Sequence, residues 1–354
     1  MPRIIAIEPV VPEHVIEQSA AAGIVRDLFA GSFKDVERLL PIFANTEIDR
    51  RYFCMPPEWF KRNHSFEEKN KLYITHALQL CEKAIRRLLA RVEIGPQDIN
   101  HIFFVSTTGV ATPSLDAHLL NRLDFSPAIR RTPIWGLGCG GGVAGIARAT
   151  DWLKAYPEKI ALVVAVELCS LTFIRDDISK SNFVATSLFG DGAGAVLLGG
   201  DHCKLNTPRM IAVTASDMIT WKDSLDVMGW EINRNGMKVL FSRDIPSIVN
   251  QSAKPAILNC LAKHGVPLEN ISFCVSHPGG AKVIRAYEAA LEFSREKTQY
   301  MWSALRQFGN MSSATVLFVL SEFLQSPDYK TGDTILSCSL GPGFTSEMFL
   351  GACL

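Results

Sequence analysis

The sequence has no long hydrophobic run. Its longest apolar stretch extends from Ile160 to Val166 and ends at Glu167, whereas a membrane-spanning helix needs about 20 apolar residues. Near the N-terminus, a four-residue apolar stretch precedes Glu8, which is too short for the core of a signal peptide. We therefore expect a cytoplasmic protein without a transmembrane segment.

Net charge and paired cysteines are also lacking. The 36 Lys and Arg residues balance 36 Asp and Glu residues, so no basic excess favours a nucleic-acid partner. The nine cysteines are irregularly spaced and form no CxxC pair, which argues against a disulfide framework and against a structural zinc site. We expect most of them to be small buried residues, and we expect no metal.

Alternating strands and helices are what the sequence does contain. The predicted strands are Ile102–Val105, Ile160–Val166, Ala193–Leu198, Met210–Thr214, Ile271–Val275 and Thr334–Ser339. The predicted helices are Leu72–Val92, Val143–Ala155, Pro255–His264, Lys282–Leu291 and Ser312–Leu324. This order predicts an α/β protein with covered sheets. A length of 354 residues and a repeated element order suggest two halves, residues 1–200 and 201–354. The polar stretch Ser216–Asp244 between them is interpreted as a lobe or lid.

The densest chemical signal is WGLGCGGGVAG at Trp135–Gly145, which opens a predicted helix. Glycines permit sharp backbone turns and close approach of a ligand. The N–H groups at a helix N-terminus stabilise a thiolate and can also bind an oxyanion. Cys139 is therefore a candidate nucleophile, with an inert cysteine in a tight turn as the alternative.

Two further residues stand at the ends of predicted elements. His277 follows a strand and precedes Pro-Gly-Gly, where ligands of α/β folds gather, although a loop histidine is an alternative. Asn310 lies in FGNMSSA at a helix start, where it serves either as an N-cap or as an amide donor to a reacting carbonyl. A Cys, His and Asn trio also serves papain-like proteolysis, but the local signature of that family is absent.

Six motifs together are specific to one family. They are WGLGCGGGVAG, ELCSLTF at 167–173, SLFGDGAGA at 187–195, SHPGG at 276–280, GNMSSAT at 309–315 and LGPGFTSE at 340–347. With these motifs the chain resembles the type III polyketide synthases, the chalcone synthase superfamily, over nearly its whole length. DVMGW at 226–230 and FSRDIP at 241–246 are most similar to the bacillus-type alkylpyrone synthases.

The resemblance implies a fold, an assembly and a reaction. The fold is the thiolase fold, in which two pseudo-duplicated α/β halves stack as αβαβα layers, and the assembly is a homodimer. Cys139 would take an acyl group from coenzyme A and form an ion pair with His277, while His277 and Asn310 would promote decarboxylation of malonyl-coenzyme A. Coenzyme A thioesters are then substrates, and no cofactor is implied.

Further positions of the site also come from the resemblance. Phe189 matches the residue that separates the coenzyme A tunnel from the reaction chamber, and Thr112 matches one that crosses the dimer interface. Glu167, Thr172 and Ser312 match residues that can hold a water which steers aldol cyclisation. The remaining matched substrate positions are Thr107, Cys169, Val239, Gly279, Gly280, Gly341, Pro342 and Gly343. The small pocket residues leave volume for a medium- to long-chain fatty acyl starter and for pyrone or resorcinol products.

Three positions depart from the family pattern. Gly140 follows Cys139 where a side chain is usual, which predicts a looser nucleophile turn. Val239 stands where many plant members have a second gatekeeper Phe, which predicts a wider cavity. Among the basic residues expected to contact coenzyme A phosphates, Arg38 is the one plausible match.

Alternatives within the same fold remain. The main one is an initiating ketoacyl-ACP synthase, although that family usually has HQAN and GNTSAA where this chain has HPGG and GNMSSA. A thiolase would need a second catalytic cysteine, for which Cys338 is the candidate by position. A non-catalytic homologue would have no physical need for Cys139, His277 and Asn310 together.

Overall fold

The computed structural model describes residues 1–29, 36–241 and 245–354. The strands are β1 (Arg3–Val10), β2 (His14–Glu17), β3 (Arg50–Phe53), β4 (His101–Val105), β5 (Arg130–Ile134), β6 (Ile160–Leu168), β7 (Asp191–Gly199), β8 (Ile211–Thr220), β9 (Met228–Asn233), β10 (Gly236–Phe241), β11 (Ile271–Cys274), β12 (Thr334–Gly341) and β13 (Thr345–Cys353). The α-helices are α1 (Gln18–Phe29), α2 (Pro41–Asn45), α3 (Phe66–Arg91), α4 (Leu115–Leu120), α5 (Gly141–Ala155), α6 (Lys180–Leu188), α7 (Ile245–Ile248), α8 (Lys254–Lys263), α9 (Ala281–Leu291), α10 (Gln299–Phe308) and α11 (Thr315–Gln325).

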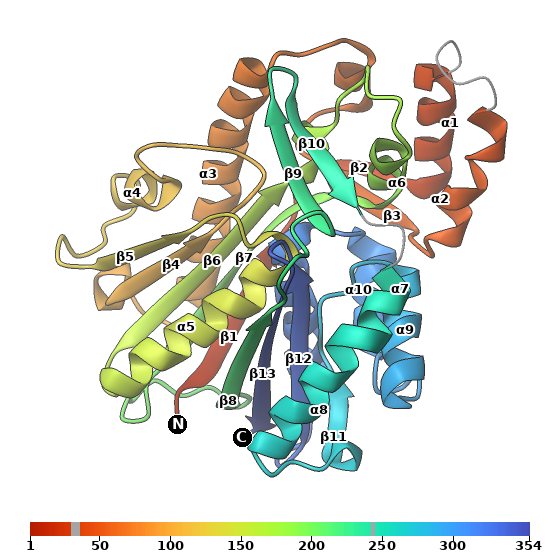
Figure 1. Cartoon of the computed structure of the whole chain (residues 1–354). Coiled ribbons are helices and arrows are strands. Elements are labelled where there is room, and N and C mark those ends of the chain that lie inside the picture. Colours follow the sequence, from red (N-terminus) through yellow and green to blue (C-terminus); the bar gives the residue numbers. More distant parts are fainter. Residues whose placement is uncertain (30–35, 242–244) are drawn as a thin grey trace.

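A nine-stranded mixed sheet with the order β11-β12-β13-β8-β1-β7-β6-β4-β5 forms the centre of the molecule (Figure 1). Its two halves join where Arg3 and Ile4 of β1 pair with Ala212 and Ile211 of β8. Each half has parallel pairing toward its outer edge and antiparallel pairing toward the join. The two halves therefore mirror each other in organisation, and the predicted α/β class is confirmed.

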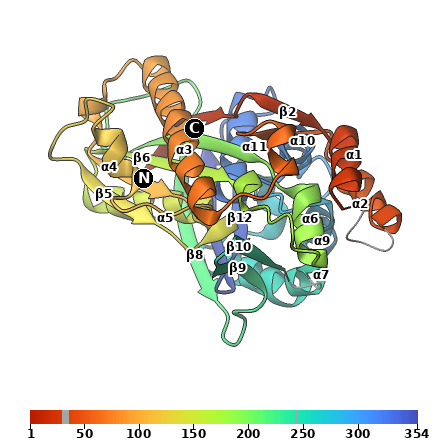
Figure 2. The same ribbon diagram turned by 90° about the horizontal axis from the view of Figure 1, so that it is seen from above.

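Helix α5 lies between the two halves of the sheet and contacts strands of both, including β6 and β13. Small residues allow this burial: a Cβ on Gly145 would lie 2.8 Å from a methyl carbon of Val163. Helix α3 covers the outer face beside β1, β6 and β7. Strands β6 and β7 are buried almost throughout because helices cover both of their faces. Figure 2 shows α4 and α1 at opposite ends of the molecule.

The predicted elements correspond to β4, β6, β7, β8, β11 and β12, and to α3, α5, α8, α9 and α11. The polar stretch that begins at Ser216 is more regular than the predicted lobe or lid. Strand β8 continues to Thr220 because its backbone pairs with β13, and a hairpin of β9 and β10 follows. Part of the FSRDIP motif, including Asp244, lies outside the described residues. Across the part of the chain that the structure describes, no helix is both long enough and apolar enough to cross a membrane.

Candidate active site

Cys139 lies in a short 3-10 turn, Gly138–Gly140, at the entrance to α5. At two of the glycines that follow, the neighbouring atoms leave no room for a Cβ. A Cβ on Gly141 would lie 2.5 Å from a methyl carbon of Val105, and one on Gly142 would lie 2.3 Å from the carbonyl oxygen of Ser313. Gly140 differs, because a Cβ there would lie 3.6 Å from its nearest neighbouring atom. The nucleophile turn can therefore approach β4 and the Ser313 segment closely only with glycine at 141 and 142.

A chain of hydrogen bonds connects Cys139 with the two other predicted catalytic residues. The thiol of Cys139 donates to Ser312 Oγ at 3.6 Å, and the backbone N–H of Ser312 donates to Asn310 Oδ1 at 2.8 Å. Asn310 Nδ2 donates to the carbonyl oxygen of Gly279 at 3.0 Å, and the N–H of Gly279 donates to the carbonyl oxygen of His277 at 3.1 Å. The structure thus brings Cys139, Asn310 and His277 into one connected region.

His277 follows β11, and its backbone N–H donates to the carbonyl oxygen of Cys338 on β12 at 2.9 Å. Its side chain is buried, and among the described residues neither Nδ1 nor Nε2 has a hydrogen-bond partner. Burial lowers the pKa of His277 to about 4. The ring is therefore a neutral imidazole near pH 7 and keeps both nitrogens available to a ligand.

The protonation of Cys139 differs from the sequence-based expectation. Burial raises the pKa of its thiol to about 12, although the hydrogen bond with Ser312 acts in the opposite direction. Together with the lowered pKa of His277, this favours a thiol and a neutral imidazole over the predicted ion pair. The main physical reason is desolvation of the thiol, to which the nearby charge of Glu167 adds.

Glu167 is a fully buried carboxylate near the nucleophile turn. Its Oε2 accepts from Thr107 N at 3.0 Å and from Thr108 Oγ1 at 2.8 Å, and its Oε1 accepts from Ser313 Oγ at 2.5 Å. Desolvation raises the pKa of Glu167 to about 7, partly offset by these donors. Thr107 Oγ1 in turn accepts from the N–H of Gly138 at 3.2 Å. Glu167 therefore positions the loop on which the Cys139 turn rests.

The segment Gly341–Gly343 packs against the other side of the Cys139 turn. A Cβ on Gly341 would lie 2.4 Å from the carbonyl oxygen of Leu137, and the ring of Pro342 adjoins Gly138. Glu347, which follows on β13, is buried and forms a two-armed ion pair with Arg148 of α5 at 2.8 and 2.9 Å. These contacts hold the segment that begins at Gly341 against the Cys139 turn and helix α5. At Gly280 the backbone φ is 158°, close to extended.

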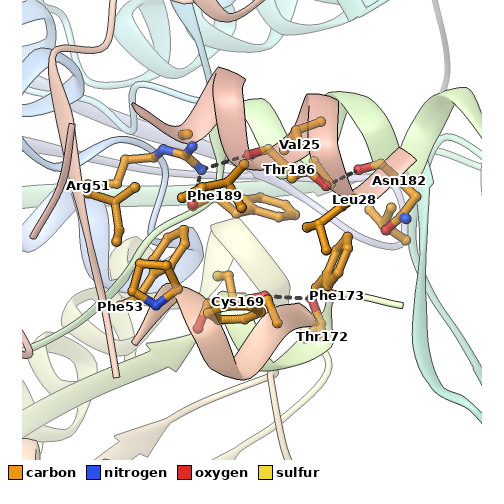
Figure 3. Close-up of a pocket in the computed structure, with 18 residues that line it drawn as sticks. Val25, Leu28, Arg51, Phe53, Cys169, Thr172, Phe173, Asn182, Thr186 and Phe189 are labelled. Atoms are coloured by element: carbon orange, nitrogen blue, oxygen red, sulfur yellow. Dashed lines mark hydrogen bonds between the residues drawn. The ribbon is translucent and has the colours of Figure 1, made fainter. Parts of the chain in front are cut away.

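An apolar cavity of about 60 Å³ adjoins the region (Figure 3). Its lining includes the predicted residues Cys169, Thr172, Phe189 and Val239. Figure 3 shows the ring of Phe189 within the lining, with Arg51 beside it and Cys169 across the cavity. Phe189 also pairs with Asn310 in a parallel β-bridge. The cavity and the hydrogen-bonded trio are therefore connected through adjacent backbone.

Other predicted positions lie elsewhere. Within the described chain, the lining of this cavity does not include Thr107, Glu167 or Ser312. The hydroxyl of Thr172 donates to the carbonyl oxygen of Cys169 at 2.7 Å. Of the three residues predicted to share a water, Thr172 is the one that lines this cavity, and the shared water stays a prediction. Thr112 and Arg38 are both exposed, Thr112 on a loop and Arg38 on a short 3-10 helix.

Several residues of the site were not predicted. Arg51 is buried and donates to the carbonyl oxygens of Thr186 at 2.8 Å and Phe189 at 2.7 Å. Phe241 is not in the cavity lining, but its ring centroid lies 5.8 Å from that of Phe189, so it packs against a side chain of the cavity wall. Nothing local in the sequence distinguishes Arg51 from its neighbour Arg50, because the distinction depends on contacts with a segment more than 130 residues away.

One group of possible metal ligands lies outside this region. Ligand atoms of Asp217, Cys260 and His264, on β8 and at the end of α8, lie within 4.8 Å of one another. The ammonium group of Lys263 is 3.0 Å from Asp217 Oδ2 and already neutralises that carboxylate. The arrangement therefore resembles a surface ion pair more than a metal centre.

Comparison with known proteins extends this picture. The sequence profile of the N-terminal domain of chalcone and stilbene synthases matches residues 2–202, and that of their C-terminal domain matches residues 213–353. A Bacillus subtilis protein provisionally described as a chalcone synthase is 44% identical, covering 98% of this chain and 97% of that protein. The 1,3,6,8-tetrahydroxynaphthalene synthase of Streptomyces peucetius is 35% identical, covering 98% and 91%.

Pks18 of Mycobacterium tuberculosis, described as an α-pyrone synthesis polyketide synthase-like protein, is 29% identical, covering 96% of this chain and 88% of that protein. Among solved structures, the tetrahydroxynaphthalene synthase of Streptomyces coelicolor superposes with a TM-score of 0.93 at 28% identity, covering 99% of both chains. The expected thiolase fold is thereby confirmed. By sequence and by structure, the chain belongs to the family of chalcone and stilbene synthases, the type III polyketide synthases.

Proposed function

We propose that this protein transfers a medium- to long-chain fatty acyl group from coenzyme A to Cys139, extends it with malonyl-coenzyme A, and cyclises the product to alkylpyrones or alkylresorcinols. The observation that carries the proposal is the hydrogen-bonded connection of Cys139, Ser312, Asn310 and Gly279 beside His277. The family profiles over both parts of the chain favour this reaction over an initiating ketoacyl-ACP synthase.

Loading begins with the Cys139 thiol. Because burial disfavours both the thiolate and the imidazolium, the proton passes to the imidazole of His277 as the sulfur attacks the starter thioester, so that the ion pair need not form before the attack. The sulfur forms the acyl thioester, and the coenzyme A thiolate leaves with that proton. The N–H groups at the start of α5 are suited to stabilise the oxyanion of the tetrahedral intermediate.

Extension uses the donors that the site holds in place. Asn310 Oδ1 accepts from Ser312 N, and one N–H of Nδ2 donates to Gly279, so the second Nδ2 N–H is left as a donor to a malonyl thioester carbonyl. Loss of carbon dioxide leaves its electron pair as an enolate, which Asn310 and His277 stabilise. The enolate carbon then attacks the acyl thioester and releases the Cys139 sulfur.

The starter proposal rests on the apolar cavity. Its walls include Val25 and Leu28 of α1 together with Cys169 and Phe189, and apolar walls of this kind suit contact with an alkyl chain. The name of Pks18 refers to α-pyrone synthesis, and that of the two Streptomyces relatives to tetrahydroxynaphthalene. Lactone and aldol products are therefore both to be assayed.

The test is a product assay with malonyl-coenzyme A and starters from acetyl- to stearoyl-coenzyme A, followed by mass spectrometry. Cys139→Ala abolishes products, whereas Cys81→Ala, which removes a buried thiol of α3, retains them. Val25→Phe narrows the cavity and shifts the preferred starter to shorter chains without loss of the acetyl reaction. Turnover of acetyl or aromatic starters alone would contradict the starter proposal and leave the synthase reaction intact.

A homodimer is part of the same proposal. Val110 is 38% exposed and Trp135 is 52% exposed. Val110 is close to Thr112 in sequence, and Trp135 adjoins the same loop through the hydrogen bond from its Nε1 to the carbonyl oxygen of Gly109. An apolar surface of this kind suits a second subunit. Light scattering on the purified protein, with Trp135→Glu as the variant, distinguishes a dimer from a monomer.

A further inference from the structure

A second cavity, of about 320 Å³, lies beside the apolar one, and Phe60 and Phe173 line both. Four cationic side chains line it, Arg62, Lys69, Arg175 and Arg234. They come from the end of a 3-10 helix, from α3, from the segment before α6 and from the turn between β9 and β10. We refer to this site as the basic cavity.

The charges in the basic cavity are only partly balanced by the protein, because Glu68, which lies outside the lining, acts on Lys69. Asp176 is the one carboxylate in its lining among the described residues, and its Oδ2 already accepts from Asn63 Nδ2 at 2.7 Å. Arg175 approaches Asp176 only to 3.9 Å. Within the described residues, Arg62, Lys69 and Arg234 form no ion pair. Arg62 and Arg234 are exposed, whereas Lys69 is buried and Arg175 half-buried. An excess of four cations over one carboxylate in the lining gives a positive potential that favours a bound anion.

Lys69 and Arg175 bring buried donor groups to the basic cavity. Lys69 is only 6% exposed, and its ammonium group contacts backbone carbonyl oxygens, that of Phe173 at 2.6 Å and that of Asn235 at 3.5 Å. Arg175 Nε is likewise buried, and among the described residues it has no hydrogen-bond partner. A buried donor without an acceptor, such as Arg175 Nε, is costly and in native proteins commonly marks a bound ion or ligand.

We propose that the basic cavity binds an oxyanion, a phosphate or a carboxylate group. Guanidinium groups match the geometry of both anions with paired N–H donors. Phe60 and Phe173 form an apolar wall on the side toward the other cavity, so an organic ester or acid whose apolar part contacts these rings also fits. The proposal is independent of the proposed function, because it concerns a different cavity and needs no turnover.

Calorimetric titration of the full-length protein with inorganic phosphate, phenyl phosphate and acetate tests the proposal. In low salt, at least one of these binds, and binding weakens as the salt concentration rises. The double variant Arg62→Gln/Arg234→Gln, which changes two exposed residues, weakens binding roughly tenfold or more. The charge-matched control Arg87→Gln/Lys330→Gln, also exposed, leaves the affinity unchanged.

Each outcome bears on the proposal. Tighter binding of phenyl phosphate than of inorganic phosphate supports an organic ester as the occupant, equal binding supports the free ion, and a preference for acetate supports a carboxylate. No binding of any probe, or equal affinity in the two double variants, overturns the proposal. Lys69→Met gives an independent check, because loss of the buried ammonium group should weaken binding even where Arg62 and Arg234 are intact.

Discussion

Glu167 of the N-terminal half and His277 of the C-terminal half are both titratable side chains buried beside the candidate site, and their surroundings are opposite. Glu167 in the first half receives hydrogen bonds from Thr107, Thr108 and Ser313. His277 in the second half has no partner on either ring nitrogen among the described residues. A buried polar group whose hydrogen bonds are all made within the protein stabilises the fold, whereas one without partners can bind a ligand. The comparison assigns positioning to Glu167 and chemistry to His277.

The largest expected effect on activity comes from replacing His277 with glutamine, and Glu167→Gln is the comparison. His277→Gln lowers kcat/KM roughly 100- to 10,000-fold, because a general base and carbonyl donor is lost, while Tm changes little. Glu167→Gln replaces one acceptor oxygen with an NH2 group, which cannot accept a hydrogen bond from Thr107, Thr108 or Ser313, so it lowers Tm more than it lowers activity. Product formation and thermal unfolding of both variants measure this contrast, and equal activity losses would contradict it.

The pH dependence of stability sharpens the same comparison. The raised pKa of Glu167, about 7 against 4.5, stabilises the fold below pH 4.5, and this contribution is lost as pH rises through 7. The lowered pKa of His277, about 4 against 6.5, stabilises the fold above pH 6.5, and this contribution is lost as pH falls through 4. Each shift corresponds to about 3 kcal/mol. In the wild-type protein the two slopes nearly cancel between pH 4.5 and 6.5.

Single variants reveal the two slopes separately. Relative to the wild type, Glu167→Gln gains about 3 kcal/mol of unfolding free energy as pH rises from 4.5 to 7, and His277→Gln loses about as much as pH rises from 4 to 6.5. Urea unfolding across this range gives both differences. Parallel curves for the wild type and either variant would mean that the corresponding pKa is not shifted.

Alanine substitutions at two glycines test the close contact between the Cys139 turn of the N-terminal half and Ser313 of the C-terminal half. Gly142→Ala costs about 2 kcal/mol and most of the activity, because its Cβ would overlap the backbone of Ser313 at 2.3 Å. Gly140→Ala is the matched control, since its Cβ meets only ordinary contacts at 3.6 Å. Unfolding by urea and the alkylation rate of Cys139 measure the outcome. Similar losses for both variants would show that the turn is not limited by space.

The smallest expected effect concerns Arg51, whose contacts hold the Phe189 segment next to Asn310. Arg51→Met leaves the carbonyl oxygens of Thr186 and Phe189 without donors but also removes a buried cation whose pKa desolvation lowers to about 9. These effects oppose each other, so the net loss of unfolding free energy is about 1 kcal/mol. The starter preference shifts because Phe189 is no longer held. Arg50→Met, at an exposed neighbour, changes neither stability nor starter preference.

The long, strongly patterned segments were predictable from the sequence. Strand β6 is a nearly continuous apolar run and begins at its predicted residue. Helix α3 has periodic apolar residues, but it begins six residues before its predicted start. The N-terminal strands and helices β1, β2, β3, α1 and α2 were not predicted, although α1 and β3 provide Val25, Leu28 and Arg51 of the cavity wall. Strand β3, for example, has four residues and pairs with the equally short β2, so its pattern is too brief to identify.

The sequence by itself identified the candidate catalytic residues of this protein. The glycines around Cys139, the turn after His277 and the position of Asn310 are local features, because a sharp turn or a helix start depends on a few adjacent residues. Their ionisation, the partners of Glu167 and the two adjoining cavities depend on side chains that lie far apart in the chain, such as Glu167 and Ser313. Desolvation and hydrogen-bond satisfaction arise from packing. Tertiary structure alone therefore decided that His277 is neutral, that Glu167 is satisfied, and that four cations share one cavity.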